Sequence, residues 1–92
     1  MDQPILGGPT LQKAFVLINA EPGNLWKIAD TASKVAGVKM AHAVTGEFDI
    51  ILYAELDDMN QLGRLIETIQ EIDGVTRTHT SVVIPPRVDV PA

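Results

Sequence analysis

The 92-residue chain contains no cysteine, which excludes disulfide bonds, thiolate metal sites and cysteine nucleophiles. It also lacks any apolar run near the ~20 residues that are needed to cross a bilayer. The N-terminus has neither the basic start nor the apolar stretch of a signal peptide. We therefore expect a cytoplasmic protein with no membrane partner.

Basic residues are few and scattered. The chain has seven Lys and Arg residues and a net charge of −5. Binding to duplex DNA usually needs a cluster of Lys and Arg that replaces phosphate counterions. Direct binding to nucleic acid is therefore not expected.

Apolar residues are abundant, at 46% of the chain. A domain of this size buries only about two-thirds of the surface of its unfolded chain. The apolar residues exceed what a single copy can hide from water, which favours self-association.

The spacing of the apolar residues predicts four strands and two helices. In chain order these are a strand at 13–20, a helix at 25–36, strands at 38–45 and 48–55, a helix from 57 to 74 and a strand at 75–84. Pro and Gly residues before the first strand predict a flexible leader at 1–12. We expect one domain at 13–84 and an extended C-terminal arm at 85–92.

Local signals mark the ends of these elements. Asn24 and Gly37 are expected to cap the first helix, and Asp58 and Gln61 have the spacing of a capping box for the second. Gly46-Glu47 predicts a tight hairpin turn. In the strand at 38–45, alternation places one set of side chains on a common face: Val38, Met40, His42 and Val44.

The two halves of the chain repeat, since residues 37–42 match residues 74–79 at an offset of 37. The order βαββαβ predicts an α+β, ferredoxin-like fold. Right-handed crossovers give a four-stranded antiparallel sheet of order 4-1-3-2 with both helices on one face. The strand at 13–20 is apolar on both faces, so we expect a second copy to cover the other face and form a dimeric α/β barrel.

The sequence gives little support for a catalytic site or a metal site. His42 and His79 are the only histidines, and a metal site needs three or four ligands. The paired carboxylates at 57–58 and at 67 and 71 are explained by helix capping and by a solvated helix face. Phosphate loops, dinucleotide fingerprints and nucleophile elbows are absent. We expect no cofactor and no catalytic residue.

Two segments call for a functional explanation. Asp49 places an acid just inside an otherwise apolar strand, where a buried charge needs a partner. Thr78 and Thr80 put two hydroxyls on one face of the last strand, which fits either β-propensity or a row of donors.

The segments 37–38, 44–49, 74–75 and 78–80 together resemble the effector-binding domain of the Lrp/AsnC transcription regulators, over about residues 14–84. Ala36 stands where that family often has proline, and the family's helix-turn-helix has no counterpart in this sequence. The resemblance implies a domain that dimerises through its sheet, assembles into tetramers or octamers and binds an amino acid between dimers. It implies transcription regulation by co-assembly with a full-length regulator.

Carried over by position, the resemblance assigns the effector site to these residues: Gly46, Glu47, Phe48, Asp49, Thr78, Thr80 and, for the ligand's side chain, Arg64 and Thr68. Two alternatives stay open. One is a small dimeric α/β-barrel enzyme of the monooxygenase or isomerase type, with His42, His79 or Asn19 as its polar interior residue. The other is an ACT-type amino-acid-binding module, which shares the βαββαβ order.

Overall fold

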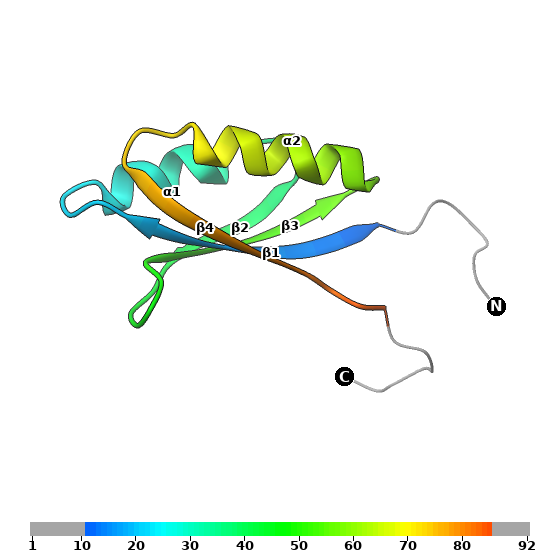
Figure 1. Ribbon diagram of the computed structural model, residues 1–92, viewed down its shortest axis with the longest axis horizontal. Coiled ribbons are helices and arrows are strands. Elements are labelled where there is room, and N and C mark those ends of the chain that lie inside the picture. Colours follow the sequence, from blue (N-terminus) through cyan, green and yellow to red (C-terminus); the bar gives the residue numbers. More distant parts are fainter. Residues whose placement is uncertain (1–10, 86–92) are drawn as a thin grey trace.

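The computed structural model describes residues 11–85 (Figure 1). Nearly all of the expected leader at 1–12 and of the arm at 85–92 lies outside these residues. The elements are β1 (Gln12–Ala20), α1 (Leu25–Ser33), β2 (Val38–Ala43), β3 (Ile50–Leu56), α2 (Met59–Gln70) and β4 (Val75–Val82). None of the described helices is long and apolar enough to span a membrane.

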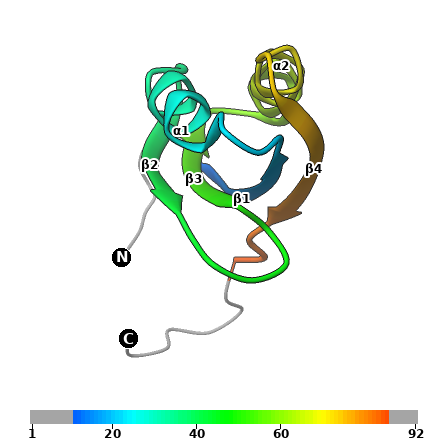
Figure 2. The ribbon, with the colours of Figure 1, turned by 90° about the vertical axis from the view of Figure 1, so that its left-hand side faces the viewer.

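The four strands form one antiparallel sheet in the order β2-β3-β1-β4. This is the predicted order 4-1-3-2 read from the other edge, so the ferredoxin-like prediction is confirmed. Both helices lie on the same side of the sheet, and the other side carries no helix (Figure 2).

The core lies between the sheet and the helices. Every second residue of β1 and β3 points into it, because side chains alternate along a strand. The fully buried large side chains are Val16, Ile18, Ile28, Ile50, Leu52, Leu62 and Ile69. Burial of this one face accounts for the 3.6-residue stripes of both helices.

The opposite face of the sheet, here called the open face, is also apolar. Phe15 on β1 is paired with Tyr53 on β3, and their ring centroids are 5.2 Å apart. Phe15 is 40% exposed and Met40 on β2 is 48% exposed. A single copy therefore leaves aromatic and sulfur-containing side chains in water on this face.

The predicted faces of the second strand are wrong in part. The register of β2 against β3 shifts between Val38 and Met40, so Lys39 is an extra residue in the strand. Because of this bulge, Val38 packs on the core together with Ala41, while Met40 and His42 lie on the open face. The register of β1 against β4 shifts at the equivalent place in the second half, at Thr76.

Helix ends follow the sequence signals only partly. Asp58 accepts a hydrogen bond from the backbone N–H of Gln61, which confirms Asp58 as the N-cap. The Gln61 side chain accepts a bond from the N–H of Asp57, one residue before the position that a capping box requires. The side chain of Asn24, in contrast, makes no capping hydrogen bond. α1 ends at Ser33, earlier than predicted, because the turns that follow it are tightened by a bond from the Val35 N–H to the carbonyl of Ala32.

Candidate functional site

The segment between β2 and β3 is a six-residue loop, Val44 to Asp49, instead of the predicted tight turn. The Val44 N–H donates to the Asp49 carbonyl over 2.9 Å, which closes the loop. The Asn19 side chain donates to the Glu47 carbonyl over 2.9 Å. The loop is thus tied back to the C-terminal end of β1.

Asp49 anchors this loop in two ways. Its N–H donates to the Ile18 carbonyl over 2.9 Å, and its carboxylate Oδ2 accepts the N–H of Ala20 over 2.8 Å. The Asp49 side chain therefore gives β1 one more hydrogen bond on its β3 side, past the last residue pair between these two strands. This explains an acid beside an apolar strand, and it leaves the other carboxylate oxygen able to accept from a ligand.

No cation neutralises this carboxylate within the part of the chain that the structure describes. The ion pair found there joins Lys34 to Asp30 on α1. A half-buried carboxylate with one free oxygen can bind an ammonium group by a charge-assisted hydrogen bond. Glu47 is exposed in the same loop and adds negative charge.

Phe48 reaches across the open face. Its ring lies edge-on to the imidazole of His79 on β4, with centroids 5.7 Å apart. His42 lies on the opposite edge strand, so two central strands separate the histidines. Among residues 11–85, no three side chains of metal-binding type come together.

Thr78 and Thr80 lie on the helix side of β4. Their cross-strand partners on β1 are the buried Ile18 and Val16. The Thr78 hydroxyl accepts a hydrogen bond from the side chain of Gln70, at the end of α2, over 3.1 Å. The hydroxyl hydrogen of Thr78 stays available to donate to a ligand.

Thr78 lines a cleft of about 350 Å³ between α2 and β4. The other lining residues are Gln70, Val75, Thr76 and Arg77. The sequence alone did not single out Gln70 or Arg77, although α2 and β4 are consecutive elements and a short connection joins them.

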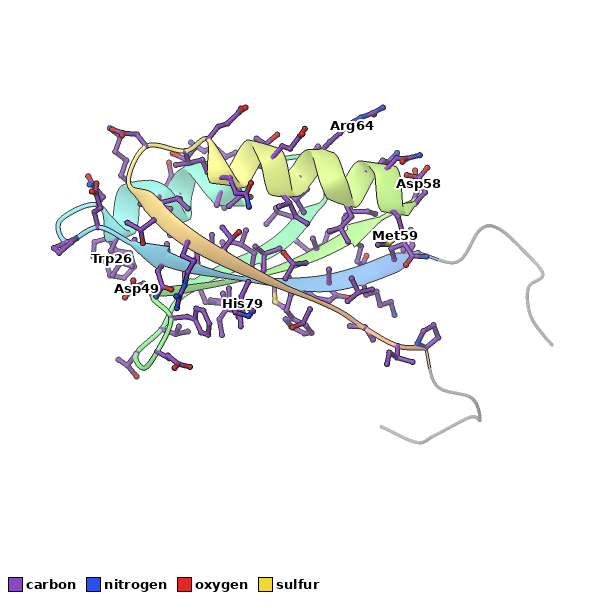
Figure 3. The ribbon with its side chains drawn as sticks, viewed as in Figure 1. Trp26, Asp49, Asp58, Met59, Arg64 and His79 are labelled. Carbon is purple, nitrogen blue, oxygen red and sulfur yellow. The ribbon has the colours of Figure 1, made fainter. Side chains whose placement is uncertain are left out.

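Arg64 and Thr68 lie elsewhere. They line a second cleft, with the segment after α1 and the end of β3, and this cleft shares no lining residue with the first. Figure 3 shows Arg64 on the outer helix layer and Asp49 at the hairpin end of the molecule. The predicted site residues therefore fall in three places: the hairpin loop, the helix side of β4 and the Arg64 cleft. Of the two threonines on β4, Thr78 lines the β4 cleft and Thr80 does not.

Asp49 and Thr78 lie on opposite sides of Ile18, one toward β3 and the other in β4. Adjacent strands are about 4.8 Å apart, so about 10 Å separates the two backbones with β1 between them. Neither of the two clefts is lined by both Asp49 and Thr78. A free amino acid carries its ammonium and carboxylate on one carbon, so the two groups must find their partners close together.

Tyr53 and Glu55 form a polar pair on the open face that was not expected from the sequence. The Tyr53 hydroxyl donates to the Glu55 carboxylate over 2.9 Å. Partial desolvation, and then the hydrogen bond and negative charge of Glu55, raise the pKa of Tyr53 above its usual value. The period-2 spacing of the two residues was the available signal.

Comparison with known proteins identifies relatives for most of the chain. The family model described as "Lrp/AsnC ligand binding domain" matches residues 13–89. An uncharacterized HTH-type transcriptional regulator of Pyrococcus abyssi is 34% identical over 71 residues, which are 76% of this chain and 45% of that protein. The chain thus spans about half the length of the regulators it matches.

One relative is an enzyme. The homocitrate synthase of Sulfurisphaera tokodaii is 34% identical over 74 residues, which are 78% of this chain but 16% of the enzyme. The matched region is a small part of that protein.

Solved structures share the fold. A hypothetical protein of Pyrococcus horikoshii has a TM-score of 0.75 and 26% identity, with 85% of this chain and 94% of that chain covered. A transcriptional regulator of Neisseria meningitidis, solved as a complex with L-Met, has a TM-score of 0.73 and 25% identity, with 85% of this chain and 53% of that chain covered.

Proposed function

The chain belongs to the Lrp/AsnC ligand binding domain family, and on that premise we propose that it senses an amino acid and passes the signal on by assembling with other chains. The observation that carries this proposal is the anchored hairpin acid. Asp49 is held in place by the N–H of Ala20 and keeps one oxygen for a ligand. In this proposal the protein acts as a homo-oligomer in the cytoplasm.

The two charged ends of the effector are assigned to different chains. Asp49, helped by Glu47, binds the ammonium group, because both carry negative charge in one loop. The carboxylate is bound by the N–H groups around Gly46 and by hydroxyl donors such as Thr78 and Thr80. Because β1 lies between Asp49 and Thr78 and Asp49 does not line the cleft that Thr78 lines, we assign the threonines of a neighbouring copy to this role.

The amino-acid class is supported by a relative. The N. meningitidis regulator was solved with L-Met and shares the fold at 25% identity. Phe48 closes the loop against His79, so it shapes the hairpin side of the site. Arg64 and Thr68 line a separate cleft and are not assigned to this effector.

Assembly begins with the open face of the sheet. Phe15, Tyr53 and Met40 present apolar surface there, and a second copy packed face to face covers it. A stable dimer of this kind buries more than roughly 1,200 Å² in total. Dimers then associate into tetramers or octamers around the hairpin loops, where the effector is enclosed.

The partner in the cell is a full-length regulator of the same family. The matched regulators are about twice as long as the matched segment, and their names state an HTH-type function. This chain contributes ligand sensing and subunit contacts to a mixed assembly, and the DNA contacts come from its partner. With a net charge of −5 and scattered basic residues, this domain is not proposed to hold duplex DNA itself, and no catalytic role is proposed for it.

A screen of the twenty amino acids by thermal shift tests the proposal. A ligand that binds only the folded state raises its stability, by about 2.7 kcal/mol at a concentration of 100 times Kd. We expect at least one amino acid to raise the melting temperature and to increase the mass measured by light scattering. If no amino acid does either, the sensing role is wrong.

A second candidate is the same sensing module acting on an enzyme. The match to one segment of a homocitrate synthase favours it, because a similar domain occurs there within an enzyme chain. Pull-down from a cell extract followed by mass spectrometry separates the two candidates, since one predicts an HTH-type regulator and the other predicts an enzyme subunit.

A catalytic role for the chain itself is less well supported. It would need a polar residue positioned on the open face of the sheet. His42 and His79 lie on opposite edge strands, and the Asn19 side chain is already bonded to the hairpin.

A further inference from the structure

The Arg64 cleft has no role in the proposed effector site. It holds about 270 Å³ between the segment after α1, the end of β3 and one side of α2. Its lining residues are Val35, Ala36, Gly37, Leu56, Gln61, Arg64, Leu65 and Thr68. The cleft is slightly smaller than most ligand sites, which favours a ligand of few heavy atoms.

The walls of this cleft are mainly apolar. Val35, Leu56 and Leu65 supply aliphatic side chains from three different elements. A ligand that fits them needs a short hydrocarbon part, because burial of apolar surface supplies most of its affinity.

The charge in the cleft is of one sign. Arg64 is the only charged residue of its lining. Within the described range, no carboxylate lies within ion-pair distance of Arg64, although the chain carries a net charge of −5. An unpaired guanidinium at an apolar cleft is suited to a carboxylate, which it can bind through two parallel hydrogen bonds.

The other polar side chains leave donors rather than negative charge. Gln61 accepts the Asp57 N–H through its carbonyl oxygen, so its amide N–H groups remain free. The Thr68 hydroxyl donates to the Arg64 carbonyl within the helix. An ammonium group placed here would meet a guanidinium and find no carboxylate, which is unfavourable.

We propose that the Arg64 cleft binds a short aliphatic carboxylate without an ammonium group, such as a branched 2-oxo acid. Arg64 binds the carboxylate, Gln61 donates to an adjacent oxygen, and the aliphatic walls enclose the hydrocarbon chain. The site differs from the hairpin site in its chemistry, because the hairpin provides negative charge and this cleft provides positive charge.

Calorimetry with three compounds that share one isobutyl group tests this assignment. The probes are 4-methyl-2-oxopentanoate, leucine and 3-methylbutylamine. We expect the oxo acid to bind and the amine not to bind. Leucine should not bind at this cleft, so any leucine binding should be unaffected by changes at Arg64.

Variants locate the binding. Arg64→Gln should weaken oxo acid binding by about tenfold to a hundredfold, because it removes a charge-assisted pair. Arg64→Lys should retain part of the affinity. Lys27→Gln, which removes the same charge from an exposed position on α1, should leave binding unchanged, as should Asp49→Asn.

Several results would overturn the assignment. They are absence of oxo acid binding, equal binding by the folded Arg64→Gln variant, or tighter binding of inorganic phosphate than of the oxo acid. Loss of binding in Asp49→Asn but not in Arg64→Gln would move the site to the hairpin. Amino-acid sensing can fail while this result stands, because that function depends on the hairpin and not on Arg64.

Discussion

Changing Asp49 to asparagine or to alanine separates its two roles. One role is structural, because the carboxylate Oδ2 accepts the Ala20 N–H over 2.8 Å. The other is the proposed binding of the effector's ammonium group, which depends on the negative charge. Asparagine keeps an acceptor oxygen and loses the charge, whereas alanine loses both.

The structural cost follows from the burial of this hydrogen bond. In Asp49→Ala the half-buried N–H of Ala20 has no acceptor, and an unsatisfied group of this kind costs about 1–3 kcal/mol. For a domain of this size each kcal/mol lowers the melting temperature by roughly 4–8 °C. Asp49→Asn should keep most of this stability.

The affinity for the amino acid should depend on the charge at position 49 and not on the stability of the variant. Both variants should lose affinity for the amino acid that binds the wild type, by about tenfold or more. Thermal melting and calorimetry on the three proteins measure the two effects separately. Unchanged affinity in Asp49→Asn would refute the ammonium role, and wild-type melting of Asp49→Ala would refute the anchoring role.

Three further predictions concern stability, ionisation and assembly. Gly74→Ala should destabilise by about 1–3 kcal/mol more than Gly46→Ala in urea unfolding, because both have positive φ but only at Gly74 would a Cβ lie 2.9 Å from an isoleucine of α1. The single tyrosine, Tyr53, should titrate above its usual pKa by ultraviolet absorbance, and Glu55→Gln should lower the midpoint. Because the folded state holds this proton more tightly, stability should fall as pH rises above about 10, and a midpoint at or below that value would contradict the contact. Light scattering should give at least twice 9.9 kDa for the wild type and a smaller mass for Phe15→Glu, and a wild-type monomer at micromolar concentration would exclude the sheet dimer.

The fold could be predicted because its signals are periodic. The alternation of β1 and the stripe of α2 each follow from which face is buried, and burial dominates the choice of structure. The crossover rule then left one strand order. The N-cap at Asp58 needed only a three-residue spacing, which local hydrogen bonding enforces.

The bulges at Lys39 and Thr76 could not be predicted from the alternation of side chains. A bulge depends on how two strands pair. Neither Lys39 nor Thr76 is of a residue type that indicates a bulge. The repeat at an offset of 37 residues carries related information, since Gly37 and Gly74 both have positive φ just before the bulged strands. A bulge in one half therefore implies a bulge in the other.

The sequence offered candidate residues for the site, and it could not say where in the fold each one lies. The sequence marked Asp49 as an acid without an explanation, and the structure supplies its first partner in Ala20. The sequence pattern also gave no reason to divide the polar side of α2 into separate surfaces. In the structure Arg64 lines the cleft beside the α1 end, whereas Gln70 turns to Thr78 on β4.

The separation of Asp49 from Thr78 bears on how sensing works if both bind the same amino acid. β1 lies between them, with about 10 Å from backbone to backbone, and the proposed site takes the ammonium partner from one chain and the carboxylate partners from another. In that arrangement a neighbouring copy brings its own threonines to the hairpin, so ligand binding and assembly share one free energy and each strengthens the other. The exposed end of the molecule carries a reporter for this step, because the single tryptophan, Trp26, is 75% exposed and lies at the same end as Asp49 (Figure 3). A change in its fluorescence that follows the increase in mass as ligand is added is the signature of a site built between copies, and a change without any increase in mass would place the site within one chain.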